Sequence, residues 1–318
     1  MNSNYLGITF NGKHSSRDIG ITMTGSRSIG YPRKRKRKIT PPYSNIAHDF
    51  SELYGDQVYD ERPISYRFNI IDFNRLTTAS VDHLATVVVN WLMNSKGKQK
   101  LIDPYIPNYH FMAEVEGDLN LEMFHSHGIL DVTFIAYPFK INDLPEGNNL
   151  WKTFNFDLDV LQETKFKTIR PSSFVELSTG GFATIGSWAT TYASSGGRIP
   201  IENIGISRRI LRRENVQSSI SSRAYELEGI SGLVVEQDII QAYRPEDTLE
   251  VTLINPGTPS VAPNVRTETK VSIVKDNMIY NFANTQNPLF RLDSGENRLK
   301  IYSIIERDIS FEFHKELI

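Results

Sequence analysis

One helical segment, residues 81–94, lies within a chain whose other apolar residues mostly recur with a period of two. Its sequence, VDHLATVVVNWLMN, places apolar side chains three and four positions apart, which is the spacing of a single helix face. Thr78 or Ser80 is expected to cap the start of this helix, and Gly97 to end it. The residues on the apolar face are Val81, Leu84, Ala85, Val88, Trp91 and Leu92. The pattern predicts one helix that packs on a β-sheet.

The segments on either side of this helix have the alternation of β-strands. Residues 64–71 alternate before the helix, and residues 109–116, 119–127 and 129–137 alternate after it. Short turns between the last three segments predict an antiparallel meander. We therefore predict an N-terminal domain, residues 1–141, built as a β-sheet or β-sandwich with one α-helix and an extended arm.

The second half of the chain, residues 142–318, is expected to form a separate domain. A length of 318 residues favours two domains, and the polar segment INDLPEGNN, residues 141–149, is the expected linker. Many short apolar segments separated by turn signals follow, which is typical of a β-sandwich. Residues 207–229 are polar and basic, so they predict a short helix or an insertion. The predicted fold class is mainly β.

The composition excludes several kinds of site. The chain has no cysteine, so disulfides, thiol nucleophiles and thiolate metal sites are absent. A net charge of −2 gives no general attraction to nucleic acid or to an anionic membrane. No segment approaches the roughly 18 apolar residues of a membrane span, and no secretory signal or common catalytic motif is present. We therefore expect that the chain is not an enzyme and that it binds no cofactor, metal, membrane or specific nucleic acid. The minor alternative is a glycoside hydrolase, for which the sequence offers no candidate pair of carboxylates.

The strongest local charge signal lies in a proline-bounded segment, residues 25–42, which we interpret as an extended arm or a long hairpin rather than core. Its basic run consists of Arg33, Lys34, Arg35, Lys36, Arg37 and Lys38. The run either contacts phosphate or an acidic partner surface, or is a solvated loop tip. No aromatic residues interleave with these cations, which favours a protein partner over nucleic acid.

Trp188 and Tyr192 are the candidate aromatic contacts of the second domain. They lie between two Gly-Gly pairs in TGGFATIGSWATTYASSGG. Exposed aromatic rings on a sandwich loop can stack on a sugar ring or on a protein partner. The alternative, which we favour, is that Trp188 belongs to the core and the glycines form turns.

Three histidines were considered as metal ligands. His125 and His127 lie two positions apart, so on a strand they share one face, and with His110 they can bind zinc. No carboxylate or further histidine follows at a characteristic spacing, so we interpret them as ordinary residues.

Four arginines repeat as a pair every four residues in ISRRILRRE. This spacing places them along one side of a helix, facing either solvent or acidic residues of a neighbouring subunit. They are Arg208, Arg209, Arg212 and Arg213.

Five motifs follow one another in the N-terminal half of the chain. They are FNGKHSSRDIGI, ISYRFNI, VDHLATVVVNWLMN, KLIDPYIPNYHFMAEVEG and DVTFIAYPFK. In order and spacing, this series resembles the distal tail protein family of long-tailed, siphovirus-type bacteriophages that infect Gram-positive bacteria. GFATIGS and LDSGENRLKIYS in the second half are similar to the galectin-like β-sandwich that ends such proteins.

The resemblance implies a structural protein of the virion, synthesised in the host cytoplasm and placed at the tail tip or baseplate. It implies a hexameric ring between the major tail-tube protein and a tail-associated lysin or tail fibre protein. The second domain would project outward and, in some relatives, hold receptor-binding proteins. The arm would be a main ring contact, with its basic run facing a neighbour or the lumen. The alternative function is a carbohydrate-binding module that recognises host cell-wall saccharide through Trp188 and Tyr192.

Overall fold

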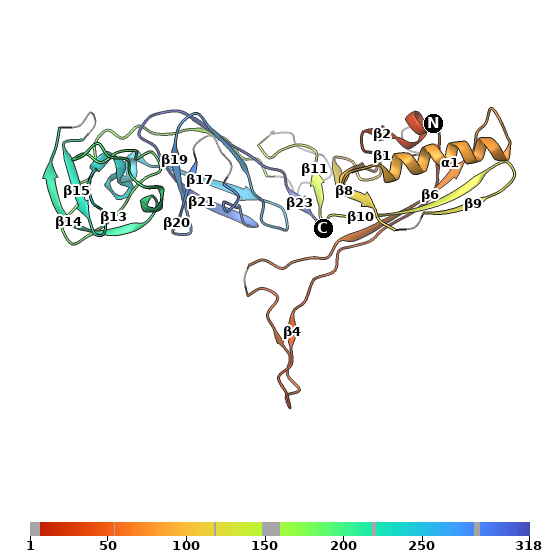
Figure 1. Cartoon of the computed structure of the whole chain (residues 1–318), viewed down its shortest axis with the longest axis horizontal. Helices are drawn as coiled ribbons and strands as arrows, with labels where there is room; N and C mark the ends of the chain where they lie inside the picture. The colour runs from red at the N-terminus through yellow and green to blue at the C-terminus, as the bar shows by residue number, and fades with distance from the viewer. Residues whose placement is uncertain (1–6, 54, 118, 148–159, 218–220, 283–286) are drawn as a thin grey trace. The chain divides into compact units, whose positions relative to one another are not determined.

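The structure is a computed structural model that describes residues 7–53, 55–117, 119–147, 160–217, 221–282 and 287–318 (Figure 1). Over these residues the chain is mainly β, as predicted, and its one α-helix is α1 (Thr78–Met93). The chain divides into two compact units. The first comprises Met1–Leu144 with His314–Ile318, and the second comprises Pro145–Phe313.

The first unit is built on one large antiparallel sheet. Its strands are β1 (Thr9–Phe10), β2 (Lys13–His14), β3 (Thr22–Ile29), β6 (Arg62–Ile70), β7 (Gln99–Ile102), β8 (Tyr109–Val115), β9 (Asn120–Met123), β10 (Gly128–Ala136), β11 (Lys140–Asn142) and β23 (Glu316–Leu317). The main path runs β2-β1-β7-β8-β10-β6-β3. The long strands β6 and β10 pair over their whole length. Each buries every second side chain, so this register places the buried side chains of both strands on one face of the sheet.

Helix α1 covers this sheet with the apolar face that the sequence predicts. Val81, Val88 and Leu92 are fully buried, and each contributes about 1.5–3 kcal/mol by leaving water. The Trp91 ring lies against Phe10, and its Nε1 donates a hydrogen bond of 3.1 Å to the Phe10 carbonyl. The cap is Thr77, one residue before the predicted position, whose hydroxyl accepts from the Ser80 amide.

The predicted three-strand meander is wrong in one respect. β8 and β9 do not form a hairpin with each other; both pair antiparallel with β10, at its end and at its start respectively. Val115 lies opposite Phe134, and Asn120 lies opposite Asp131. β8 and β9 therefore lie end to end along β10 rather than side by side.

The last residues of the chain belong to the first unit, whereas the sequence interpretation placed them in the second. β23 pairs with β11, and the backbone amide of Asn142 donates to the carbonyl of Lys315 at 3.0 Å. The start of the expected linker is thus a strand, and residues 148 and 149 of that linker lie outside the described residues.

The second unit contains three antiparallel sheets. The strands are β12 (Lys165–Lys167), β13 (Phe182–Thr184), β14 (Ser207–Asn215), β15 (Arg223–Leu227), β16 (Leu233–Val235), β17 (Leu249–Asn255), β18 (Asn264–Thr267), β19 (Val271–Lys275), β20 (Met278–Phe282), β21 (Gly295–Tyr302) and β22 (Asp308–Glu312). Their orders are β12-β22-β18, β17-β21-β19-β20 and β13-β14-β15-β16. Four single turns of 3₁₀ helix lie at Ile201–Asn203, Glu236–Asp238, Ile240–Ala242 and Pro245–Asp247.

The first two of these sheets form the predicted β-sandwich, and their inner faces share one apolar core. Leu253 and Ile273 of one sheet pack in the same cluster as Phe311 of the other. The third sheet has its own core around Tyr225 and Ile239. A smaller aromatic cluster, which includes Trp188, Tyr243 and Tyr302, joins the sandwich to the third sheet.

The segment 207–229 corrects a sequence expectation. It contains no helix in its described part and forms the paired strands β14 and β15. Ile210 is buried opposite Leu227, so the segment is held by apolar pairing across the two strands. Residues 218–220 lie outside the described part.

Candidate functional site

The predicted arm is a two-stranded ribbon, residues 31–61, that leaves the sheet between β3 and β6 (Figure 1). Its two halves run antiparallel and include the short strands β4 (Lys38–Ile39) and β5 (His48–Asp49). The Arg35 amide donates to the Val58 carbonyl at 2.9 Å, and the Asp60 amide donates to the Arg33 carbonyl at 2.8 Å. The arm is thus longer than the predicted residues 25–42, because the chain returns along residues 48–60.

The root of the arm is fastened by a buried arginine. Arg62 is only 2% exposed, and burial lowers the pKa of its guanidinium. Its Nε donates to the Gly30 carbonyl at 2.7 Å, and its Nη1 donates to the Pro138 carbonyl at 3.2 Å. These bonds connect the outgoing chain of the arm to the end of β10.

A second polar cluster fastens β3 to the sheet. The buried carboxylate of Asp103 accepts from Arg27 Nη1 at 3.2 Å and from the Tyr66 hydroxyl at 3.2 Å. The Arg27 guanidinium also lies over the Tyr105 ring. Burial, with the Asp103 carboxylate second, raises the pKa of Tyr66 well above its usual range, so this hydroxyl stays a hydrogen-bond donor. The arm therefore begins from a fixed position.

Gly30 at the root has no room for a side chain. A Cβ at this position would lie 2.8 Å from the carbonyl oxygen of Pro63, whose backbone cannot move away independently. We expect Gly30→Ala to lower the free energy of unfolding of the first unit by about 1–3 kcal/mol. Urea unfolding measures this change, and faster hydrogen exchange of the Arg35 amide would locate it at the arm.

The control for this variant is Gly197→Ala, where the nearest atom is the movable hydroxyl of Ser195. Its effect should be smaller than 1 kcal/mol or so. Equal effects at the two positions would contradict a close approach at the arm root.

Two of the six cations of the basic run are balanced by the returning half of the arm. Arg35 pairs with Asp60 at 2.7 Å, and Lys36 pairs with Asp49 at 3.1 Å. Hydrogen bonds from Ser51, together with the Lys36 ammonium, lower the pKa of Asp49 to about 2. Among the described residues, the other four cations of the run make no ion pair; they are Arg33, Lys34, Arg37 and Lys38.

The arm also exposes a set of apolar side chains that the sequence analysis missed. Ile46 is 67% exposed and Leu53 is 60% exposed, although both are large and apolar. The full set is Tyr31, Ile39, Tyr43, Ile46, Phe50, Leu53 and Val58. Their spacing has no period because no face of the ribbon is buried, so apolar content in an unpatterned segment was the only available signal. We call these residues the apolar arm set.

The structure corrects the candidate sugar contacts of the second unit. Trp188 is 6% exposed and Tyr192 is 7% exposed, so neither ring offers a face to a ligand. The indole Nε1 of Trp188 donates to the Gln237 carbonyl at 2.9 Å, and its ring packs edge-on against Tyr243. Tyr192 lies so close to Gly232 that a Cβ there would fall 2.5 Å from its ring. Both side chains are core residues; the favoured interpretation of the sequence had placed only Trp188 in the core.

The three histidines do not come together. His127 precedes the first residue of β10, while His110 pairs on β8 with Ile141, beyond the last residue of β10. His110 Nδ1 lies 2.8 Å from the Asp143 carboxylate, and burial lowers the pKa of its ring. No group of three or more metal-ligating side chains occurs within the described residues.

The four arginines lie on a strand rather than a helix. β14 carries all of them, and the acidic residues nearest to them come from the same unit. Arg212 pairs with Glu226 on the neighbouring strand and with Glu214, and Arg213 pairs with Glu176. Arg208 donates to the carbonyl of Glu228. Arg208 and Arg209 make no ion pair among the described residues, so only these two leave a charge free for acidic residues of a neighbouring subunit.

Comparisons with known proteins give structural neighbours only. No protein-family model and no curated protein matches this chain. One neighbour is the SPP1 Dit (gp 19.1) protein, described as a paradigm of hub adsorption apparatus in Gram-positive infecting phages. The two sequences are 8% identical, and the match covers 98% of this chain and 99% of that chain with a TM-score of 0.40. Another neighbour is a chain of the phage p2 baseplate in its activated conformation with Sr. The two sequences are 10% identical, and the match covers 91% of each chain with a TM-score of 0.25. No helix in the described part of the chain is long and apolar enough to cross a membrane.

Proposed function

We propose that this chain is a structural hub subunit of a phage tail tip or baseplate, and that it acts by assembly rather than by catalysis. In this proposal it forms a hexameric ring in the virion, between the tail-tube protein and a tail-associated lysin or tail fibre protein. The second unit would then be available to receptor-binding proteins. The ordered series of N-terminal motifs supports the family, and the arm supports the mode of assembly.

The observation that carries the proposal is the apolar arm set. A two-stranded ribbon is marginally stable alone, and it has no core in which to bury large apolar side chains. Several large apolar residues exposed on one segment are typical of an interaction surface, and the four unpaired cations on the same ribbon favour an acidic partner surface. A ring closed by rotation supplies the missing surface, because each subunit then presents its arm to a different surface on the next copy.

The alternative function, a carbohydrate-binding module with Trp188 and Tyr192 as its site, conflicts with the burial of both rings. Their rings are in the core, so a sugar could reach them only after local unfolding. The arm has no role in that alternative, whereas a ring explains both its apolar residues and its charge.

The test is the solution mass of the purified protein by light scattering after size exclusion, at about 0.05 M and about 0.5 M salt. We expect a mass near six protomers of 36.3 kDa at low salt. Higher salt screens the attraction between the four unpaired cations of the basic run and the neighbouring subunit. The ring should therefore dissociate into protomers at a higher protein concentration in about 0.5 M salt than in about 0.05 M salt. A monomer at every concentration and in both salts would contradict assembly of the isolated chain.

A further inference from the structure

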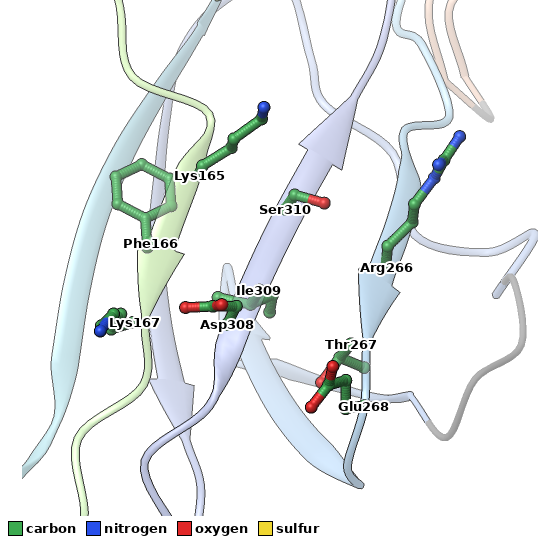
Figure 2. A pocket seen from close by; sticks show the side chains of 9 residues that line it. All are labelled: Lys165, Phe166, Lys167, Arg266, Thr267, Glu268, Asp308, Ile309 and Ser310. Carbon is green, nitrogen blue, oxygen red and sulfur yellow. The ribbon is translucent and has the colours of Figure 1, made fainter.

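The sandwich of the second unit has a hollow on the outer face of its three-stranded sheet. The cavity has a volume of about 730 Å³ and lies over β12, β22 and β18 (Figure 2). An adjoining cavity of about 310 Å³ shares Lys165, Arg266 and Ser310 with it. This volume is in the range of small-molecule sites.

The strand register arranges the polar side chains in rows across the sheet. Ser310 on the central strand pairs with Lys165 on one side and with Arg266 on the other, so the three side chains form one row. Lys167 and Asp308 pair in the next row on the same face. The residues between them point inward to the core, as the burial of Ile309 shows.

One end of the hollow is cationic. Figure 2 shows the Lys165 and Arg266 side chains extending toward the same end, with the Ser310 hydroxyl between their strands. Lys165 makes no ion pair with any described residue, and Arg266 shares its charge with a single carboxylate, Glu312, at 2.5 Å. A flexible ammonium and a guanidinium that flank a hydroxyl are suited to binding an anionic group by charge-assisted hydrogen bonds.

The other end of the hollow has two carboxylates beside one ammonium, that of Lys167. Asp308 and Glu268 lie there, on the side away from Lys165 and Arg266 (Figure 2). Asp308 makes no ion pair among the described residues, and Glu268 has one long contact of 4.0 Å with Arg307. Ionised carboxylates only accept hydrogen bonds, so they suit donors such as sugar or polyol hydroxyls. The two ends therefore select different groups of one ligand.

We propose that this face binds a hydroxylated small molecule, a sugar or polyol, that carries a phosphate or carboxylate group. The anionic group lies between Lys165 and Arg266 with a hydrogen bond from Ser310. The hydroxyl groups extend toward Asp308 and Glu268. The site is separate from the arm and does not depend on the hub function, so it can exist in a monomer.

The test is isothermal titration calorimetry of the full chain with glucose 6-phosphate, glucuronate, glucose and inorganic phosphate as probes. Glucose 6-phosphate and glucuronate should both bind, and the one that binds more tightly identifies the anion. Glucose and inorganic phosphate should each bind about tenfold more weakly, because each makes only one of the two sets of contacts. The proposal is wrong if neither glucose 6-phosphate nor glucuronate binds. If inorganic phosphate binds as tightly as glucose 6-phosphate, the proposed contact of the carboxylates with sugar hydroxyl groups is wrong.

The variants Lys165→Met and Arg266→Met should each weaken binding of the charged sugars by about tenfold. Both side chains are exposed, so the fold should be unchanged. The control is Arg298→Met, which removes another exposed arginine, on β21 in the other sheet, and should leave affinity unaltered. An equal loss in the control would mean that only the overall charge matters and would contradict the site.

Discussion

Replacing residues 34–59 with Asn-Gly should give a folded protein that no longer assembles. Arg33 and Asp60 are already neighbours across the ribbon, since the Asp60 amide donates to the Arg33 carbonyl at 2.8 Å. Two residues with left-handed backbone preference can close that hairpin without strain. The bonds of Arg62 at the root stay in place, so the first unit should retain its core while all of the apolar arm set except Tyr31 is removed.

Light scattering after size exclusion measures the outcome, and we expect one protomer at concentrations where the parent chain forms a ring.

A milder variant changes Ile39, Ile46 and Leu53 to serine and keeps the ribbon. It should raise the concentration needed for assembly by at least about 100-fold, because three apolar side chains lose their burial at the interface. Serine at Ile201, Phe182 and Leu289, exposed apolar residues of the second unit, is the control. Rings of normal mass from the arm-replaced chain would refute the role of the arm.

Asp238→Asn should raise the free energy of unfolding by about 4 kcal/mol at about pH 8 and leave it unchanged at or below about pH 4. The Asp238 side chain is 7% exposed, and burial raises the pKa of its carboxyl from 3.8 to about 7. Between these two values the unfolded chain releases the proton while the folded chain keeps it. Stability therefore falls by about 1.4 kcal/mol for each pH unit across this window and is constant above it.

The matched control is Asp247→Asn, which changes an aspartate of equal burial that has partners. The Asp247 carboxylate accepts from the amide of Ser172 at 3.2 Å and from its hydroxyl at 3.3 Å. An asparagine keeps one acceptor oxygen for these donors but lacks the charge and the second oxygen, so the bonds weaken and this variant should lose about 1–3 kcal/mol. Urea unfolding at the two pH values separates the variants. A gain at Asp238→Asn that is the same at both pH values would show that charge burial is not its cause.

Local pattern was sufficient where the buried face of an element lies within one continuous segment. Helix α1 is the clearest case, because its spacing of three and four fixes which residues meet the sheet. Strands β6 and β10 follow from alternation for the same reason. The arm was only half predicted. Proline and the basic run indicated its outgoing half, but the return segment has both faces in solvent and so has no period.

The sequence alone determined that the chain is mainly β, where its one α-helix lies and where the charged arm begins, because these depend on neighbours a few residues apart. Only the tertiary structure decided that β14 is a strand, since Ile210 needs Leu227 opposite it. It also buried Trp188 by bringing Tyr243 against it. The hollow on the sandwich has the same origin: its main row joins strands β12, β18 and β22 from distant parts of the chain. Strand pairing of this kind is chosen by packing of the whole unit, which no local spacing records.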